Sequence, residues 1–366
     1  MIRWRDGVVA QVGRSWAGAV ELTVTVGAQS VRALAYPDLV GTPVAGDRVL
    51  LNVSALDRGL GTGGYALVVA VPDRLPEDPP ERGHLVKARY TPMQAMVLGA
   101  DEQDSPDHDV LRDADDLFGT PVVVADLHSA LPAVLAGVYE ARPTTRVVYV
   151  MTDGGALPLA FSRTVATLRE AGWLSGTVTV GQAYGGDREA VTVHTGLLTA
   201  VQVLAAEVVV ITQGPGNLGT GTRWGFSGVQ SGEAVNAVGT LGGRAVASLR
   251  ISEADPRPRH RGISHHSLTA YGRVALQPAD VVVPDLAGDF GDSVRDAAEP
   301  LKARHRVVRV GVDGLYEAME AAPVKLSTMG RGLDEDRAYF EAAAAAGRHA
   351  AGLVDVPPPG VGTQYS

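Results

Sequence analysis

The feature that most constrains this chain is a series of short apolar runs, rich in β-branched residues, that recur through its second part. They lie at 122–125, 146–151, 177–181, 208–212, 245–251, 281–283 and 306–312. Most are apolar without alternation, as in parallel strands covered on both faces. Helically spaced apolar residues separate them, such as Leu157, Phe161, Val165 and Leu168. We therefore predict an α/β domain over residues 85–352, with an open, mostly parallel, doubly wound sheet.

The first 72 residues have a different pattern. Val20, Leu22, Val24 and Val26 alternate with polar residues, and further short strands are expected at 31–36, 49–53 and 65–71. This spacing predicts a small all-β, barrel-like domain. A proline-rich linker should follow at 73–84, and residues 353–366 should form a flexible tail.

Composition removes several function classes. The 366 residues include no cysteine, which excludes disulfide scaffolds, thiolate enzymes and iron–sulfur proteins. The formal net charge of −9 argues against wholesale nucleic-acid binding. The apolar runs are too short to cross a bilayer, and residues 1–6 lack the apolar part of a secretory signal. We expect a cytoplasmic protein without membrane or nucleic-acid partners; a homo-oligomer is compatible with the sequence.

Polar or glycine-rich segments follow five of the predicted strands. They lie at 126–129, 152–155, 182–187, 213–219 and 252–267. Ligands of open parallel sheets bind outside the carboxyl ends of the strands. The sequence therefore predicts that these segments converge on one edge and form a site there.

The segment 257–266 is the most unusual, because it holds three arginines and three histidines in an acidic protein. Arg259 and Arg261 can hold a phosphate or carboxylate. Alternatively, His260 with His265 or His266 can bind a divalent metal. Adjacent histidines are expected to diverge, so one of them should lie outside the metal's coordination shell. A third interpretation is a solvated basic loop in which Ser264 caps a short helix.

Three more residues at strand ends are candidates. Asp126 and His128 can supply metal ligands, or a carboxylate that orients a histidine. Asp153 can likewise ligate a metal or act in catalysis. The structural alternative is that both aspartates bond to loop amides and that His128 packs at a helix start.

A glycine-rich loop and an arginine complete the candidate site. Residues 214–219 match G-x-G-x-x-G, but Pro215 has no N–H, and the acidic residue that ends the following strand, Glu253, lies well beyond the interval of about 20 residues in a dinucleotide fold. We expect neither nicotinamide nor flavin. The loop can instead cradle an anion, and Arg331 can close over it. The substrate-binding candidates in the loop are Gly214, Gly216, Asn217, Gly219, Thr220 and Arg223.

Three strings are distinctive when taken together. They are Tyr36-Pro37-Asp38-Leu39-Val40-Gly41, His260-Arg261-Gly262-Ile263-Ser264-His265-His266 and Ser327-Thr328-Met329-Gly330-Arg331-Gly332. They resemble a bacterial family known as domain of unknown function 3866, and the resemblance covers most of the chain, barrel included. It implies no activity, cofactor or substrate.

The leading hypothesis is a hydrolase of a small anionic substrate. His260, His265, Asp126 and Asp153 would carry the chemistry, with or without a divalent metal. A first alternative is a non-catalytic protein that binds a nucleotide or phosphometabolite. A second is RNA binding through the N-terminal barrel.

Overall fold

The computed structural model describes residues 1–80 and 83–356. It divides into two compact units, the first made of Met1–Val97 with Ala160–Ala166 and the second of Leu98–Leu159 with the residues from Thr167 on. The predicted linker, 73–84, falls within the first unit, apart from residues 81–82, which lie outside the described residues. Of the predicted tail, residues 357–366 also lie outside them.

The first unit contains a closed five-stranded barrel. Its strands are β1 (Trp4–Trp16), β2 (Ala19–Val26), β3 (Gln29–Ala35), β4 (Arg48–Asn52) and β5 (Ala66–Ala70), in the order β1-β2-β3-β5-β4. Alternate side chains of β2 fill the interior, including Leu22 and Val24. Shorter elements of this unit are α1 (Pro37–Val40), η1 (Leu56–Arg58), β6 (Leu85–Lys87) and β7 (Ala95–Val97).

The second unit is built on an open sheet of eight strands, all of them parallel. The strands are β8 (Pro121–Val124), β9 (Val147–Thr152), β10 (Gly176–Val180), β11 (Arg188–Ala190), β12 (Val208–Gln213), β13 (Arg244–Ser248), β16 (Asp280–Pro284) and β17 (Arg306–Val310). Their order is β11-β10-β9-β12-β8-β13-β16-β17. The predicted combination of a small barrel with an open parallel sheet is confirmed, because each buried apolar run forms the expected strand.

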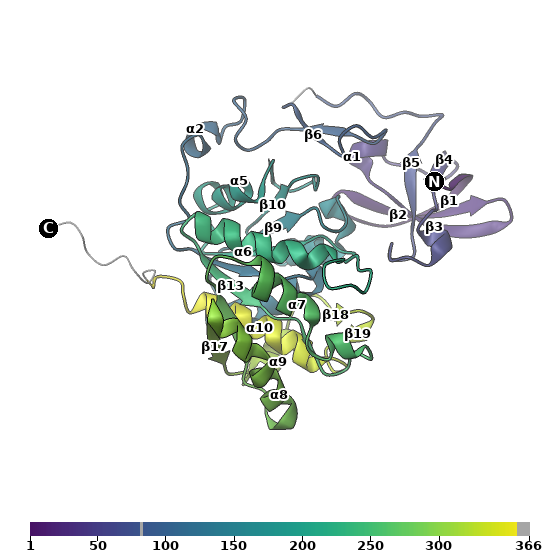
Figure 1. Ribbon diagram of the computed structural model, residues 1–366. Coiled ribbons are helices and arrows are strands. Elements are labelled where there is room, and N and C mark those ends of the chain that lie inside the picture. Colours follow the sequence, from purple (N-terminus) through teal and green to yellow (C-terminus); the bar gives the residue numbers. More distant parts are fainter. Residues whose placement is uncertain (81–82, 357–366) are drawn as a thin grey trace. The chain divides into compact units, whose positions relative to one another are not determined.

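Helices cover both faces of this sheet, as a doubly wound fold requires. One face carries α3 (Leu131–Ala141), α9 (Leu315–Glu320) and α10 (Arg337–Ala351), and the other carries α5 (Val193–Leu198), α6 (Gln230–Thr240) and η7 (Ala270–Val274). Figure 1 shows α6 and α10 on opposite sides of the strands. The remaining helices and small strands are α2 (His108–Leu111), η2 (His128–Ala130), η3 (Leu159–Phe161), α4 (Arg163–Glu170), η4 (Thr199–Val203), η5 (Ser227–Val229), β14 (Ile251–Ser252), η6 (Pro258–His260), β15 (Gly262–Ile263), α7 (His265–Thr269), α8 (Gly288–Ala298), η8 (Glu299–Ala303), β18 (Ser327–Thr328) and β19 (Arg331–Gly332).

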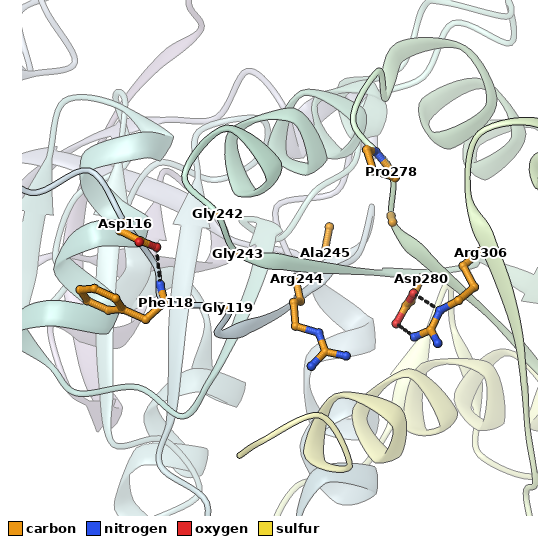
Figure 2. Close-up of a pocket in the computed structure, with 11 residues that line it drawn as sticks. Asp116, Phe118, Gly119, Gly242, Gly243, Arg244, Ala245, Pro278, Asp280 and Arg306 are labelled. Atoms are coloured by element: carbon orange, nitrogen blue, oxygen red, sulfur yellow. Dashed lines mark hydrogen bonds and ion pairs between the residues drawn. The ribbon is translucent and has the colours of Figure 1, made fainter. Parts of the chain in front are cut away.

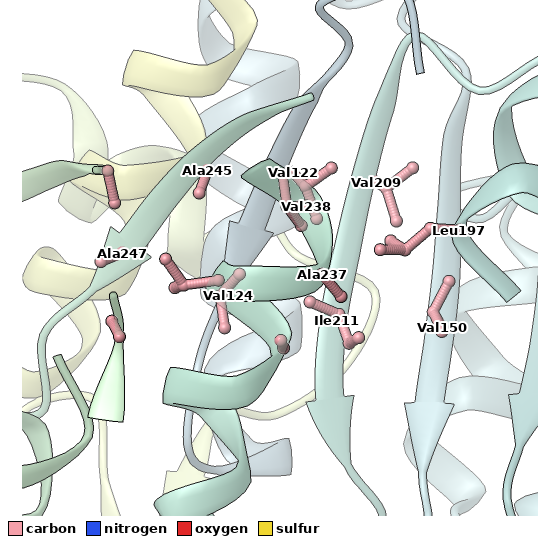
Figure 3. Close-up of a cluster of buried hydrophobic side chains, with 14 of the residues drawn as sticks. Val122, Val124, Val150, Leu197, Val209, Ile211, Ala237, Val238, Ala245 and Ala247 are labelled. Atoms are coloured by element: carbon pink, nitrogen blue, oxygen red, sulfur yellow. The ribbon is translucent and has the colours of Figure 1, made fainter. Parts of the chain in front are cut away.

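The core of the second unit lies between the sheet and its helices. Val122, Val124 and Ile211 from the central strands meet Leu197 of α5 and Val238 of α6, and all five side chains are buried (Figure 3). Aliphatic side chains of this kind pack at high density. The core therefore fixes the strand ends, where the candidate residues lie.

None of the helices in the described part of the chain combines the length and the apolar character needed to cross a membrane.

Candidate functional site

The candidate site lies where the chain changes direction across the sheet. From β8 the chain proceeds to β9 on one side of the sheet, and from β12 it proceeds to β13 on the other side of β8. Such a switch point leaves a crevice outside the carboxyl ends of the adjacent strands. Asp126 follows β8, Gln213 ends β12, and Arg250 follows β13, so three neighbouring strands deliver polar residues to this place.

Three histidines gather at this edge and form what we call the histidine cluster: His260, His265 and His266. One ring nitrogen from each lies within 4.8 Å of the others. Ring centroids are 4.4 Å apart for His265 and His266, and 4.8 to 5.0 Å apart for the pairs that include His260. The expected divergence of the adjacent histidines is not observed: their ring centroids are 4.4 Å apart, although both residues lie in the first turn of the short helix α7.

The side chains around the cluster fix its rings. Ser264 Oγ lies 2.7 Å from His260 Nδ1, and the same oxygen accepts a hydrogen bond from the His266 amide, which makes Ser264 the N-cap of α7. The His266 ring stacks on Phe226, with centroids 3.8 Å apart. Since His260 Nδ1 is engaged, its Nε2 is the nitrogen left for a ligand. The Nε2 atom of His265 is buried and has no hydrogen-bond partner.

Asp126, one of the candidate residues from the sequence, lies beside the cluster. Its Oδ2 is 3.8 Å from His266 Nδ1, is buried, and has no hydrogen-bond partner. Burial raises the pKa of the Asp126 carboxyl, and the Arg250 guanidinium opposes that shift. A carboxylate in this place can orient a histidine for a metal, which is one of the two roles that the sequence left open.

A buried ionic network supports the histidine cluster from behind. Asp255 Oδ2 lies 2.8 Å from Arg257, 3.5 Å from Arg331 and 3.6 Å from Arg250. Asp336 lies 2.9 Å from Arg331 and also accepts hydrogen bonds from Ser252. Within the network, Asp255 and Asp336 offset two of the three arginine charges.

The pKa values of the cluster are displaced in one direction. Burial, reinforced by the Arg250 guanidinium, lowers the pKa of His260 and of His266 to about 3. Burial and then Arg259 lower the pKa of His265. All three imidazoles are therefore neutral near pH 7, and the neutral ring is the form that binds a metal.

Three other predicted residues have partners of their own. Asp153 Oδ2 accepts a hydrogen bond from the amide of Gln182 and so holds a turn; Asp153 is not part of the histidine cluster. His128 Nδ1 lies 3.0 Å from the Tyr149 hydroxyl, and burial lowers the His128 pKa to about 4. Arg331 is committed to Asp255 and Asp336 in the ionic network.

The glycine-rich loop uses its own polar groups internally. The Thr220 amide donates to the Gly225 carbonyl, and the Asn217 side chain accepts from Gln213 and from Ser227. A Cβ on Gly214 would lie 2.4 Å from the Ala156 carbonyl oxygen, so that glycine is required by close packing of two loops. Gly216 and Gly219 belong to the same hairpin-like loop. Gly219 forms an isolated antiparallel β-bridge with Phe226. The loop thus positions Phe226 against His266.

A cavity of about 750 Å³ opens beside His265. Arg223, Arg259 and Arg273 line it, and we call it the arginine cavity. Gly221 of the loop also lines it, and a Cβ on that glycine would lie 4.0 Å from Arg259 Nη2. The exposed side chain of Arg261 is not among the lining residues. Two of the predicted arginines, Arg223 and Arg259, therefore line one cavity with Arg273, which the sequence did not single out.

A second cavity, of about 780 Å³, lies at the opposite edge of the sheet, where β13, β16 and β17 begin (Figure 2). Its charged groups have partners within the protein. The Asp280 carboxylate pairs with the Arg306 guanidinium, and Arg244 donates to the carbonyl of Val356. No predicted site residue lines this cavity.

Several supporting residues were missed by sequence reasoning. Arg250, Asp255 and Asp336 are common residue types in ordinary loops, and nothing in their spacing indicates that they meet. Phe226 carries a weak signal, since an aromatic residue next to a glycine-rich loop is unusual in a chain with 5% aromatic residues. Its contact with His266 depends on tertiary structure alone.

Comparisons with known proteins are consistent with the strings noted in the sequence. The comparison with curated proteins finds no match. A family model described as "Protein of unknown function (DUF3866)" matches residues 32–347. The match begins in β3 of the barrel and ends in α10, and so includes the histidine cluster and the arginine cavity. Because it spans most of the chain, this protein belongs to the DUF3866 family.

Proposed function

We propose that this protein is a metal-dependent hydrolase in which His260, His265 and His266 hold a divalent transition metal such as Zn²⁺. The observation that carries the proposal is the convergence of three imidazole nitrogens within 4.8 Å of one another at the carboxyl edge of the sheet. Three histidines are a ligand set of catalytic zinc sites, which keep a fourth position for water.

The chemistry of the surroundings supports a metal. The imidazoles are neutral, and the unpartnered His265 Nε2 is available as a ligand. Nitrogens bound to one tetrahedral zinc ion are separated by about 3.3 Å, given Zn–N bonds of about 2.0–2.1 Å. The rings would therefore move closer together on binding.

The proposed reaction is hydrolysis of a small anionic ester. A metal of this kind lowers the pKa of a bound water and so supplies a nucleophile at neutral pH. Asp126 would act as a positioning residue for His266 by closing the 3.8 Å between its Oδ2 and His266 Nδ1 to a hydrogen bond. The unpaired arginines beside His265 would hold the charge of the substrate.

The decisive experiment is elemental analysis of the 366-residue chain purified without chelator, then dialysed against Zn²⁺, Mn²⁺, Co²⁺ or Ni²⁺ in turn. We expect one metal per chain, lost in His260→Ala and His265→Ala. The control is His194→Ala, because His194 is exposed and lies outside the cluster. No stoichiometric metal with any of the four ions would overturn the proposal.

Turnover is tested separately with phosphate and carboxylate esters. Metal-dependent release of product, abolished in His260→Ala, is the expected result. Binding of these esters without turnover by the metal-loaded protein would instead favour a regulatory protein that senses an anionic metabolite.

A further inference from the structure

The arginine cavity holds guanidinium groups that the protein leaves unpaired. Among the described arginines of the second unit, only Arg223, Arg259, Arg261 and Arg273 form no hydrogen bond or ion pair; every other one has a carboxylate or carbonyl partner. Three of these four line one cavity. All three are exposed, so their charges are accessible to a ligand from solution.

No acidic residue is among those that line the arginine cavity. The cavity at the other edge of the sheet differs, because there Asp280 neutralises Arg306. Guanidinium groups that share a cavity repel one another, and an anion bound among them offsets that repulsion. Arginine is also the side chain best suited to bidentate recognition of phosphate oxygens.

Apart from Thr269, the side chains in the rest of the cavity wall are apolar. Leu268, Ala297, Pro300 and Leu301 contribute to it. A volume of about 750 Å³ is within the range of small-molecule sites, which combine an apolar lining with a few polar groups. Inorganic phosphate would leave this apolar wall uncovered, whereas an organic phosphate would cover it.

We propose that the arginine cavity binds an organic phosphate monoester, with its phosphoryl group on Arg223, Arg259 and Arg273 and its organic body against the apolar wall. His265 belongs both to this cavity and to the histidine cluster. The bound phosphoryl group therefore lies next to the cluster. That the phosphate monoester is a substrate rests on the proposed function, whereas its binding to the cavity requires no metal.

The test is calorimetric titration of the chelator-treated protein with 4-nitrophenyl phosphate, in a buffer free of phosphate and sulfate. Each of Arg223→Gln, Arg259→Gln and Arg273→Gln should weaken binding by at least about tenfold, since each removes charge-assisted hydrogen bonds. The control is Arg14→Gln in the barrel, which makes the same charge change at an exposed arginine that forms no ion pair. It should change the affinity less than about twofold.

Three outcomes would overturn this inference. They are the absence of 4-nitrophenyl phosphate binding, retention of affinity in all three cavity variants, and inorganic phosphate binding as tightly as 4-nitrophenyl phosphate. Metal content, measured in parallel, keeps the two proposals separate. Normal phosphate-ester binding without any metal site would overturn only the proposed function, and a metal site without ester binding would overturn only the cavity's role.

Discussion

The imidazole of His266 stacks on the phenyl ring of Phe226, with 3.8 Å between ring centroids and 2° between ring planes. Phe226 follows the glycine-rich loop, and His266 lies in the first turn of α7, so the contact joins the segments after β12 and β13. Because both residues are buried, the ring of Phe226 limits how His266 can rotate.

Phe226→Leu should therefore weaken metal binding without removing a ligand. Aromatic pairs contribute about 0.5–1.5 kcal/mol, which corresponds to a loss of roughly two- to tenfold in metal affinity. Competition with a chromophoric chelator measures the affinity. Phe226→Tyr keeps the aromatic ring and should retain the metal affinity. Equal metal affinities in Phe226→Leu and the unaltered protein would contradict the positioning role of Phe226.

Ser264→Ala should affect stability and metal binding together. The hydroxyl caps α7 and contacts His260 Nδ1, so its loss should lower the free energy of unfolding by about 0.5–2 kcal/mol and metal affinity by about tenfold or more. The matched control is Thr192→Ala, which removes the N-cap of α5. That variant should lose stability but retain metal affinity. Urea unfolding and chelator competition give the two values.

Helices α3 and α10 pack so closely that adding one methyl group between them should destabilise the fold. A Cβ on Gly137 of α3 would lie 1.9 Å from the Ala344 carbonyl oxygen of α10. Alanine has the better helix propensity, but overpacking costs roughly 1–3 kcal/mol and requires the backbones to move apart. Gly137→Ala should thus lower the midpoint of urea unfolding. Gly311→Ala, whose Cβ meets no atom within 4 Å, is the control and should change it little.

The sequence predicted most strands of the sheet, which are apolar runs, and missed a strand of the barrel whose side chains are mostly exposed. The runs at 208–212 and 281–283 became β12 and β16 because their side chains are buried. Strand β1 was not identified separately, since Gly7 and Val9 are its only buried residues. At the site, the histidines and Asp126 follow strands and could be predicted from that position. The Asp255 network could not, because it depends on how loops of different origin fold over one another.

The acid sensitivity of the fold should depend in part on Asp280. Burial raises its pKa, but hydrogen bonds from His349 and Arg306 outweigh that effect and lower it to about 2, below the usual value of 3.8 for an aspartate. A carboxyl with a depressed pKa in the folded state stabilises the fold above its unfolded pKa, and this contribution is lost as the pH falls from about 4 towards 2. Asp280→Asn should therefore cost about 1–2 kcal/mol at pH 7, allowing for the exposure of Arg306, and less at pH 3. Asp115→Asn, at an exposed carboxylate without an ion pair, provides the comparison in urea unfolding at both pH values. If the free energy of unfolding of Asp280→Asn differed from that of the unaltered protein by the same amount at both pH values, the loss would come from packing and not from the ionised carboxylate.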